Sequence, residues 1–134
     1  VFGDNNGTVA ITAGGRTGSK AATVTIAAYG DGAAGLLPQL DSSTCAPAAV
    51  PGATYAVTAY YKATAASRFL LYYRDSGGVW HYWTESSDVG PSSTWTQARF
   101  TTPAVPAGAT AISFSLSLMG IGTLMTDDYG VARS

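Results

Sequence analysis

The residues best suited to chemistry lie in one short stretch, "LYYRDSGGVWHYW" (71–83), which holds five aromatic side chains and the only histidine of the chain. The aromatic rings offer flat apolar faces, and Arg74 and His81 lie beside them as hydrogen-bonding groups. Sugar rings have a complementary surface, because their C–H faces stack on aromatic rings while their hydroxyls meet polar side chains. The stretch therefore has the mixture of residues that saccharide binding requires.

Catalysis is poorly supported by the residues available. His81 is the only histidine available for a catalytic triad, and no Ser or Cys lies in a GxSxG nucleophile context. Metal catalysis needs several His, Cys or carboxylate ligands, which are scarce here. The motif "GGRTGS" (14–19) lacks the GK[ST] ending of a phosphate loop and is interpreted as a turn. Two of the eight acids could still converge as a glycosidase pair, so a small hydrolase stays a third hypothesis.

Length and charge limit the function classes further. The 134 residues predict one domain, residues 1–134. Only 11% of the residues are charged and the net charge is −1 with no basic run, which argues against a nucleic-acid partner. No apolar stretch of about 18 residues occurs, so no membrane span is expected. Low charge with an uncharged polar surface is typical of a secreted protein.

Hydrophobic alternation with a period of two predicts strands almost everywhere, and no window sustains a helical period. Turn signals separate these strands, and "DSGG" between two aromatic strands is a clear hairpin signal. The sequence therefore predicts an all-β fold, an antiparallel β-sandwich of two sheets. The predicted strands are 8–12, 22–29, 54–62, 67–75, 79–86, 94–101 and 111–119.

The same alternation assigns side chains to the core or to solvent. Because ionisable groups are rarely buried unpaired, the faces that carry Lys62, Arg74, His81 and Glu85 should meet solvent. Tyr60, Tyr72 and Trp83 share those faces, whereas parity directs Trp80 and Tyr82 towards the core. The core is expected to include Tyr55, Phe69, Trp95, Phe100 and Phe114. The predicted ligand-binding residues are Tyr60, Tyr72, Arg74 and Trp83, with Trp80, His81, Glu85 and Gln97 as second choices.

Asp127 and Asp128, in "TDDYG" (126–130), are the only adjacent carboxylates. They belong either to a solvated turn or strand end, or to one side of a structural calcium site, since Ca²⁺ takes hard oxygen ligands. Asp4 could add an oxygen to such a site. Cys45 has no partner within the chain and is either a buried small hydrophobe or paired outside it.

Several motifs resemble carbohydrate-binding modules of families 4, 9 and 22, in which similar strands recur in the same order. These motifs are "VPGATYAVTAYYKA" (50–63), "SSTWTQARFTTPAVPAGATAISFSL" (92–116) and "GTLMTDDYGV" (122–131). The chain is similar above all to modules attached to secreted actinobacterial polysaccharide-degrading enzymes. The sequence motifs that carry this similarity lie at residues 36–47 and 72–83.

The resemblance implies a jelly-roll β-sandwich without catalysis of its own, which binds a polysaccharide and targets an attached catalytic domain of a longer precursor to it. A β-glucan or related glycan is the implied ligand. The family often carries one structural Ca²⁺ near the chain ends, and Asp127 or Asp128 matches the position of its carboxylate. The family's N-terminal strand precedes the point at which this sequence begins, so that strand, a calcium ligand and a partner for Cys45 are expected outside it.

Two other binding hypotheses remain open. The chain can instead be a structural or adhesive β-sandwich whose aromatic face docks onto protein. The discriminating feature is whether that face forms a groove for one glycan chain or a flat patch. An anionic polymer is a further candidate ligand if Lys62, Arg68, Arg74 and Arg99 share one sheet face in the fold.

Overall fold

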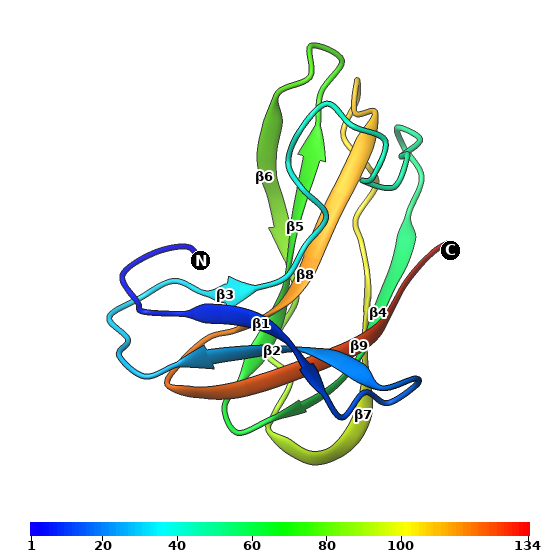
Figure 1. Ribbon diagram of the computed structural model, residues 1–134. Coiled ribbons are helices and arrows are strands. Elements are labelled where there is room, and N and C mark those ends of the chain that lie inside the picture. The colour runs from blue at the N-terminus through cyan, green and yellow to red at the C-terminus, as the bar shows by residue number, and fades with distance from the viewer.

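The computed structural model describes residues 1–134, and nine strands form two antiparallel sheets packed face to face (Figure 1). The five-stranded sheet has the order β1-β2-β9-β4-β7, and the four-stranded sheet has the order β3-β8-β5-β6. The chain contains no helix, and thus none long and apolar enough to cross a membrane. The predicted jelly-roll β-sandwich is confirmed. The strands are β1 (Thr8–Ala13), β2 (Lys20–Ile26), β3 (Ala34–Gly35), β4 (Tyr55–Ala63), β5 (Ser67–Arg74), β6 (Trp80–Glu85), β7 (Ser92–Thr101), β8 (Ala111–Leu118) and β9 (Gly122–Arg133).

All seven strands predicted by alternation are present, and β5 and β6 are joined by the predicted hairpin, where the Asp75 N–H donates to the Val79 carbonyl at 2.8 Å. Alternation missed β3 and β9. The first has two residues, too few to show a period, and the second changes its register partway along its length.

The core lies between the sheets and is built from the alternate residues of each strand. Val57, Ala59 and Tyr61 of β4 pack against Phe69 and Leu71 of β5 in one cluster of 14 buried residues. Burying each large apolar side chain contributes about 1.5–3 kcal/mol, so this cluster supplies most of the apolar stabilisation. A second, smaller cluster lies around Tyr55 and Ile112.

β9 bends where Asp127 and Asp128 lie. Asp128 has a positive φ of 50°, and the register with β4 shifts between Thr58 and Tyr60. Such a bulge sharpens the local twist, and in Figure 1 β9 runs beside β2 before turning upward to the C-terminus. β9 pairs with β2 only over its first residues, up to Thr126, and continues beside β4 alone.

Two segments outside the sheets lie over the four-stranded sheet. The connection 36–47, cyan in Figure 1, crosses in front of β8, and the Ser113 hydroxyl donates to the Pro38 carbonyl at 2.8 Å. The N-terminal segment is joined to the chain after β2 by a bridge between Phe2 and Ala33. This close approach requires Gly32, because a Cβ there would collide with the Phe2 carbonyl. Both segments can therefore form walls above the sheet.

Candidate functional site

Three aromatic rings share the outer face of the four-stranded sheet, the face turned away from the core. Tyr72 of β5 is directly opposite Tyr82 of β6, and their rings meet edge to face with centroids 6.1 Å apart. Arg74 is opposite Trp80, with its guanidinium carbon 5.7 Å from the indole centroid. The three rings thus form a partly exposed platform across two neighbouring strands.

The prediction for β6 was wrong in detail because this strand contains an irregularity. The register shifts by one residue between Leu71 and Tyr72, so that Trp83 has no partner of its own on β5. Counting alternate residues back from Glu85 therefore assigns the wrong side to Trp83 and to the residues before it. Trp83, expected on the outer face, packs against both core clusters, whereas Trp80 and Tyr82, expected inward, lie outside.

His81 is exposed but does not belong to the platform. Its ring stacks on Tyr73 with centroids 5.0 Å apart, and its Nε2 lies 2.8 Å from Asp75 Oδ2. This hydrogen bond, with those from the Val79 and Gly77 N–H groups, lowers the pKa of the Asp75 carboxyl. His81 therefore stabilises the β5–β6 hairpin end.

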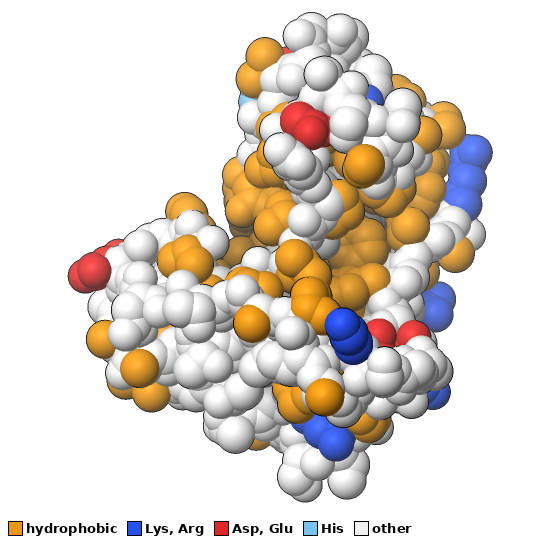
Figure 2. Space-filling view, viewed as in Figure 1, with side chains coloured by type: hydrophobic (Ala, Val, Ile, Leu, Met, Phe, Trp, Pro, Cys, Tyr) orange, Lys and Arg blue, Asp and Glu red, His pale blue; other side chains and the backbone are white.

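Two rings of the platform, Tyr72 and Tyr82, also line a groove. Two adjoining hollows of about 180 and 320 Å³ lie over the four-stranded sheet and share Phe2, Ala33, Leu70 and Tyr72. Figure 2 shows hydrophobic side chains gathered in the hollowed middle of the molecule, on both sides of the segment that crosses it. We call the two hollows together the aromatic groove. The residues lining only one of them are Val1, Gly35, Leu37, Leu40, Ser115 and Ser117 in the smaller, and Tyr82, Glu85 and Met119 in the larger.

Polar groups lie along the aromatic groove. Arg68 on β5 binds Glu85 at 2.9 Å and Asp88 at 2.6 Å, which raises the pKa of its guanidinium, with Asp88 as the main cause. Burial raises the pKa of the Tyr72 and Tyr82 phenols, so both hydroxyls stay protonated at neutral pH. The groove therefore offers rings together with hydroxyl and charged hydrogen-bonding groups.

Arg74 and Trp80 also hold one wall of the groove. Arg74 Nη1 donates to the carbonyls of Asp41 and Ser43 at 3.1 and 3.0 Å, and Trp80 Nε1 donates to the same Asp41 carbonyl at 3.0 Å. The Asp41 carboxylate accepts hydrogen bonds from Ser43, which lower its pKa. Part of the hydrogen-bonding capacity predicted for a ligand is therefore used to position the connection 36–47.

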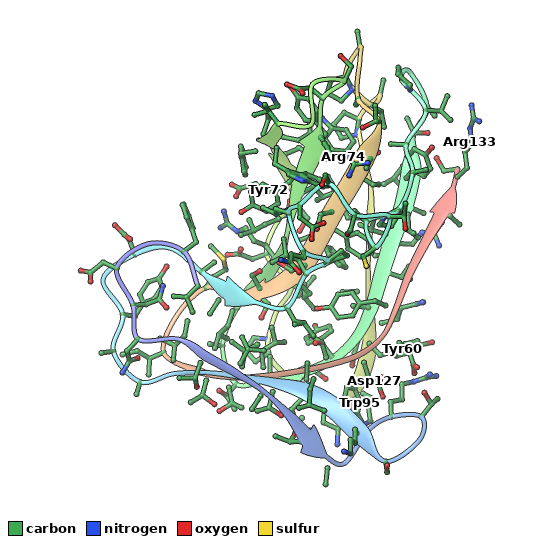
Figure 3. All side chains as sticks on the ribbon, turned by 45° about the horizontal axis from the view of Figure 1, so that its top comes forward. Tyr60, Tyr72, Arg74, Trp95, Asp127 and Arg133 are labelled. Carbon is green, nitrogen blue, oxygen red and sulfur yellow. The ribbon has the colours of Figure 1, made fainter.

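Tyr60 and Gln97 lie on the opposite side of the sandwich, on the outer face of the five-stranded sheet, where they pair across β4 and β7. Figure 3 shows Tyr72 and Arg74 well separated from Tyr60 and Asp127. The guanidinium of Arg16, from the β1–β2 hairpin, lies 3.4 Å above the Tyr60 ring centroid. The predicted ligand-binding residues therefore do not form one site.

The two adjacent carboxylates face this same hairpin. Asp127 Oδ2 accepts from the backbone N–H groups of Arg16 and Thr17 at 2.8 and 3.2 Å, and Asp127 Oδ1 accepts from Asp128 N–H. Asp128 accepts from the Thr17 hydroxyl at 2.5 Å and from Arg16 at 2.8 Å, and these bonds lower its pKa. All four carboxylate oxygens thus accept hydrogen bonds, and the Arg16 guanidinium places a positive charge beside Asp128. No cluster of three or more metal-ligating side chains occurs.

A larger hollow of about 450 Å³ opens between the sheets, where the connection 36–47 passes over β8 and β9. Its lining includes Leu37, Phe114 and Tyr129 and contains no charged side chain. Cys45 lies at this hollow and is exposed, so it is not a buried hydrophobe. Glu85 lines the aromatic groove and can bind a sugar hydroxyl, and the paired rings of Tyr72 and Tyr82 offer a stacking surface, which favours the groove as the glycan site.

Tyr82, Leu70 and Phe2 are groove residues that sequence reasoning missed. The signal for Tyr82 was its aromatic neighbourhood, but the register shift at Trp83 reversed its predicted side. Leu70 shares its predicted face with Tyr72 and was available from parity. No sequence pattern indicated that Phe2 would lie against the sheet.

Solved structures share this fold at low sequence identity. The chain matches part of a structure that contains the CBM22-1 and GH10 modules of Clostridium thermocellum xylanase 10B with xylohexaose. The identity is 19% and the TM-score 0.59, and the match covers 98% of this chain and 25% of that one. It matches the CBM22-1 xylan-binding domain of Paenibacillus barcinonensis Xyn10C at 14% identity and a TM-score of 0.60, covering 96% and 81%.

It also matches the family 11 carbohydrate-binding module of Clostridium thermocellum Lic26A-Cel5E at 14% identity and a TM-score of 0.61, covering 99% and 85%. No family model matches the sequence, and no curated protein matches it either. The chain therefore has the β-sandwich fold of carbohydrate-binding modules, as the sequence resemblance predicted.

Proposed function

We propose that this chain binds a polysaccharide, a β-glucan or a related glycan, through the aromatic groove and without catalysis. The observation that carries the proposal is the platform of Tyr72, Trp80 and Tyr82 on one sheet face, bordered by the connection 36–47 and by Phe2. Stacking of a sugar on these rings buries its C–H face, and the hydroxyls at its rim can reach Glu85 and the phenols. The neighbours of known structure that are xylan-binding modules support the same function.

The form of the site favours a glycan over a protein partner. An adhesive sandwich would dock through a broad, flat patch, whereas the platform here lies beside walled hollows of about 180 and 320 Å³. A groove of this kind fits a chain-like ligand better than a second protein surface.

The same proposal includes the setting of the module. The chain spans a quarter of the xylanase structure that joins a binding module to a GH10 module, and an attached catalytic domain in a secreted precursor fits this precedent. A structural Ca²⁺ at Asp127 and Asp128 stays a prediction.

Affinity electrophoresis tests the proposal. The protein is run through native gels that contain β-glucan, xylan or cellulose derivatives, with bovine serum albumin as the non-binding marker. We expect retardation by at least one neutral glycan and none of the marker. Equal mobility of the protein in all gels would rule out the proposed function, and hydrolysis of a glycan that Asp-to-Asn changes abolish would instead support the hydrolase.

A further inference from the structure

A second set of aromatic and polar side chains lies on the outer face of the five-stranded sheet. Trp95, expected in the core, belongs to neither core cluster and lies on the same side of β7 as Gln97 and Arg99. Lys62 Nζ lies 5.1 Å from the Trp95 ring centroid. The register pairs Gln97 with Tyr60 and Arg99 with Thr58, so these residues run along two adjacent strands. We call Lys62, Trp95, Gln97 and Arg99 the cationic face.

The cations of this face have no anionic partner in the protein. None of the four ion pairs in the structure involves Lys62 or Arg99. The nearest acids along the sheet, Asp127 and Asp128, are already bound by the β1–β2 hairpin. The chain as a whole is slightly acidic, with a net charge of −1. Two unpaired cations therefore make this face more positive than the rest of the protein.

A hollow of about 350 Å³ adjoins Lys62. Its lining includes the hydroxyls of Ser93 and Thr123, which make no side-chain hydrogen bond, and the apolar side chain of Met125. Lys62 therefore stands between an indole ring on one side and a hydroxyl-lined hollow on the other. Arg99 lies opposite Thr58, four residues from Lys62 on β4, which places the backbone positions of the two residues about 13 Å apart along the strands.

We propose that the cationic face is a second binding site, separate from the aromatic groove, for a glycan whose sugars carry carboxylate groups. One sugar stacks on Trp95 while its carboxylate meets the Lys62 ammonium, and a carboxylate further along the chain meets the Arg99 guanidinium. Charge-assisted hydrogen bonds of this kind are stronger than those between neutral groups, so the acidic sugar is preferred over its neutral counterpart. Because the two faces are on opposite sides of the sandwich, both sites can be filled together.

Isothermal titration calorimetry with a galacturonate hexasaccharide tests this site, with the fully methyl-esterified hexasaccharide as the neutral comparison. We expect the wild type to bind the acid form and to bind the ester at least tenfold more weakly. Lys62→Gln and Trp95→Ala should each weaken binding of the acid form about tenfold, because each removes a contact worth about 1.4 kcal/mol. Arg133→Gln is the matched control, since Arg133 is also exposed and basic but lies at the end of β9, away from this face (Figure 3).

The outcomes separate this site from the aromatic groove. Tyr72→Ala should leave binding of the acid hexasaccharide unchanged while reducing binding of neutral glycans. Equal affinity for acid and ester, an Arg133→Gln loss as large as that of Lys62→Gln, or no binding by wild type at millimolar oligosaccharide would each overturn the proposal. Loss of acid binding in Tyr72→Ala would place the ligand in the groove and would also overturn it.

Discussion

Arg74 and Trp80, which face each other across β5 and β6, both donate a hydrogen bond to the carbonyl oxygen of Asp41, at 3.1 and 3.0 Å. Asp41 lies in the connection 36–47, more than thirty residues earlier in the sequence. The aromatic platform thus holds its own wall in place. A ligand that contacts the platform meets a surface whose edge is already ordered by the same side chains.

Trp80→Phe should loosen this wall while keeping a ring on the platform. The change removes the indole N–H and leaves one fewer donor for the Asp41 carbonyl, a loss of about 1 kcal/mol. Hydrogen–deuterium exchange should therefore become faster in a peptide covering 38–46, with other regions unaffected. Trp95→Phe, on the opposite face, is the control, and unchanged exchange in Trp80→Phe would contradict the anchoring role.

Tyr82→Ala should weaken glycan binding without harming the fold. Tyr82 is 56% exposed, so its ring contributes little to core packing, but it forms part of the platform beside Tyr72. Loss of one stacking ring costs about 1 kcal/mol, or roughly fivefold in Kd, beyond the lost contact area. Calorimetry with a glycan that binds the wild type measures this change, and an unchanged Kd would exclude Tyr82 from the site.

Trp83→Ala should lower the stability of the fold rather than remove a ring that contacts the glycan. Trp83 packs against both core clusters, so its removal leaves a cavity and should lower the free energy of unfolding by about 2–3 kcal/mol. Urea unfolding measures the loss. If instead Trp83→Ala is as stable as the wild type and binds glycan more weakly, the ring lies on the outer face and the register of β6 is different.

The comparison of these two residues shows what the sequence could and could not predict. Strand positions follow from local alternation, which is why seven strands and the "DSGG" hairpin were predicted correctly. The side on which β6 residues point depends on a one-residue shift against β5, and that shift is a property of the pair of strands. Trp95 was placed in the core on its hydrophobicity, although its parity with Gln97 and Arg99 already indicated solvent.

The wall residues could not be predicted for a different reason. Phe2 reaches the groove because its backbone pairs with Ala33, and Leu40 reaches it because Arg74 and Trp80 hold the connection near Asp41. Both contacts join segments without a hydrophobic period of their own. Only the folded structure brings them to the same sheet.

Asp128→Asn should weaken the attachment of the β1–β2 hairpin in a pH-dependent way. Hydrogen bonds from Thr17 and Arg16 lower the pKa of Asp128 below 3.8, so the carboxylate stabilises the folded state above that pH. As pH falls through the lowered pKa, the carboxylate is protonated and its contribution is lost. The difference in Tm between wild type and Asp128→Asn should therefore be constant from pH 5 to 8 and shrink below about pH 4. A difference that grows on acidification would contradict this account.

Calcium dependence can be checked on the same protein. If the Arg16 guanidinium and the Thr17 hydroxyl alone hold Asp128, adding Ca²⁺ or EDTA leaves the Tm unchanged. A rise in Tm with Ca²⁺ that Asp127→Asn removes would show that the carboxylates exchange the hairpin for the metal, as the family resemblance predicts.

The most direct test of the central claim is the Kd of a neutral glycan for the wild type, Tyr72→Ala and Tyr60→Ala, measured by calorimetry. Tyr72 is on the platform of the aromatic groove, whereas Tyr60 lies beneath Arg16 on the opposite face. The account predicts that Tyr72→Ala weakens binding about tenfold while Tyr60→Ala stays within twofold of the wild type. Equal Kd values for wild type and Tyr72→Ala, or a loss confined to Tyr60→Ala, would contradict it.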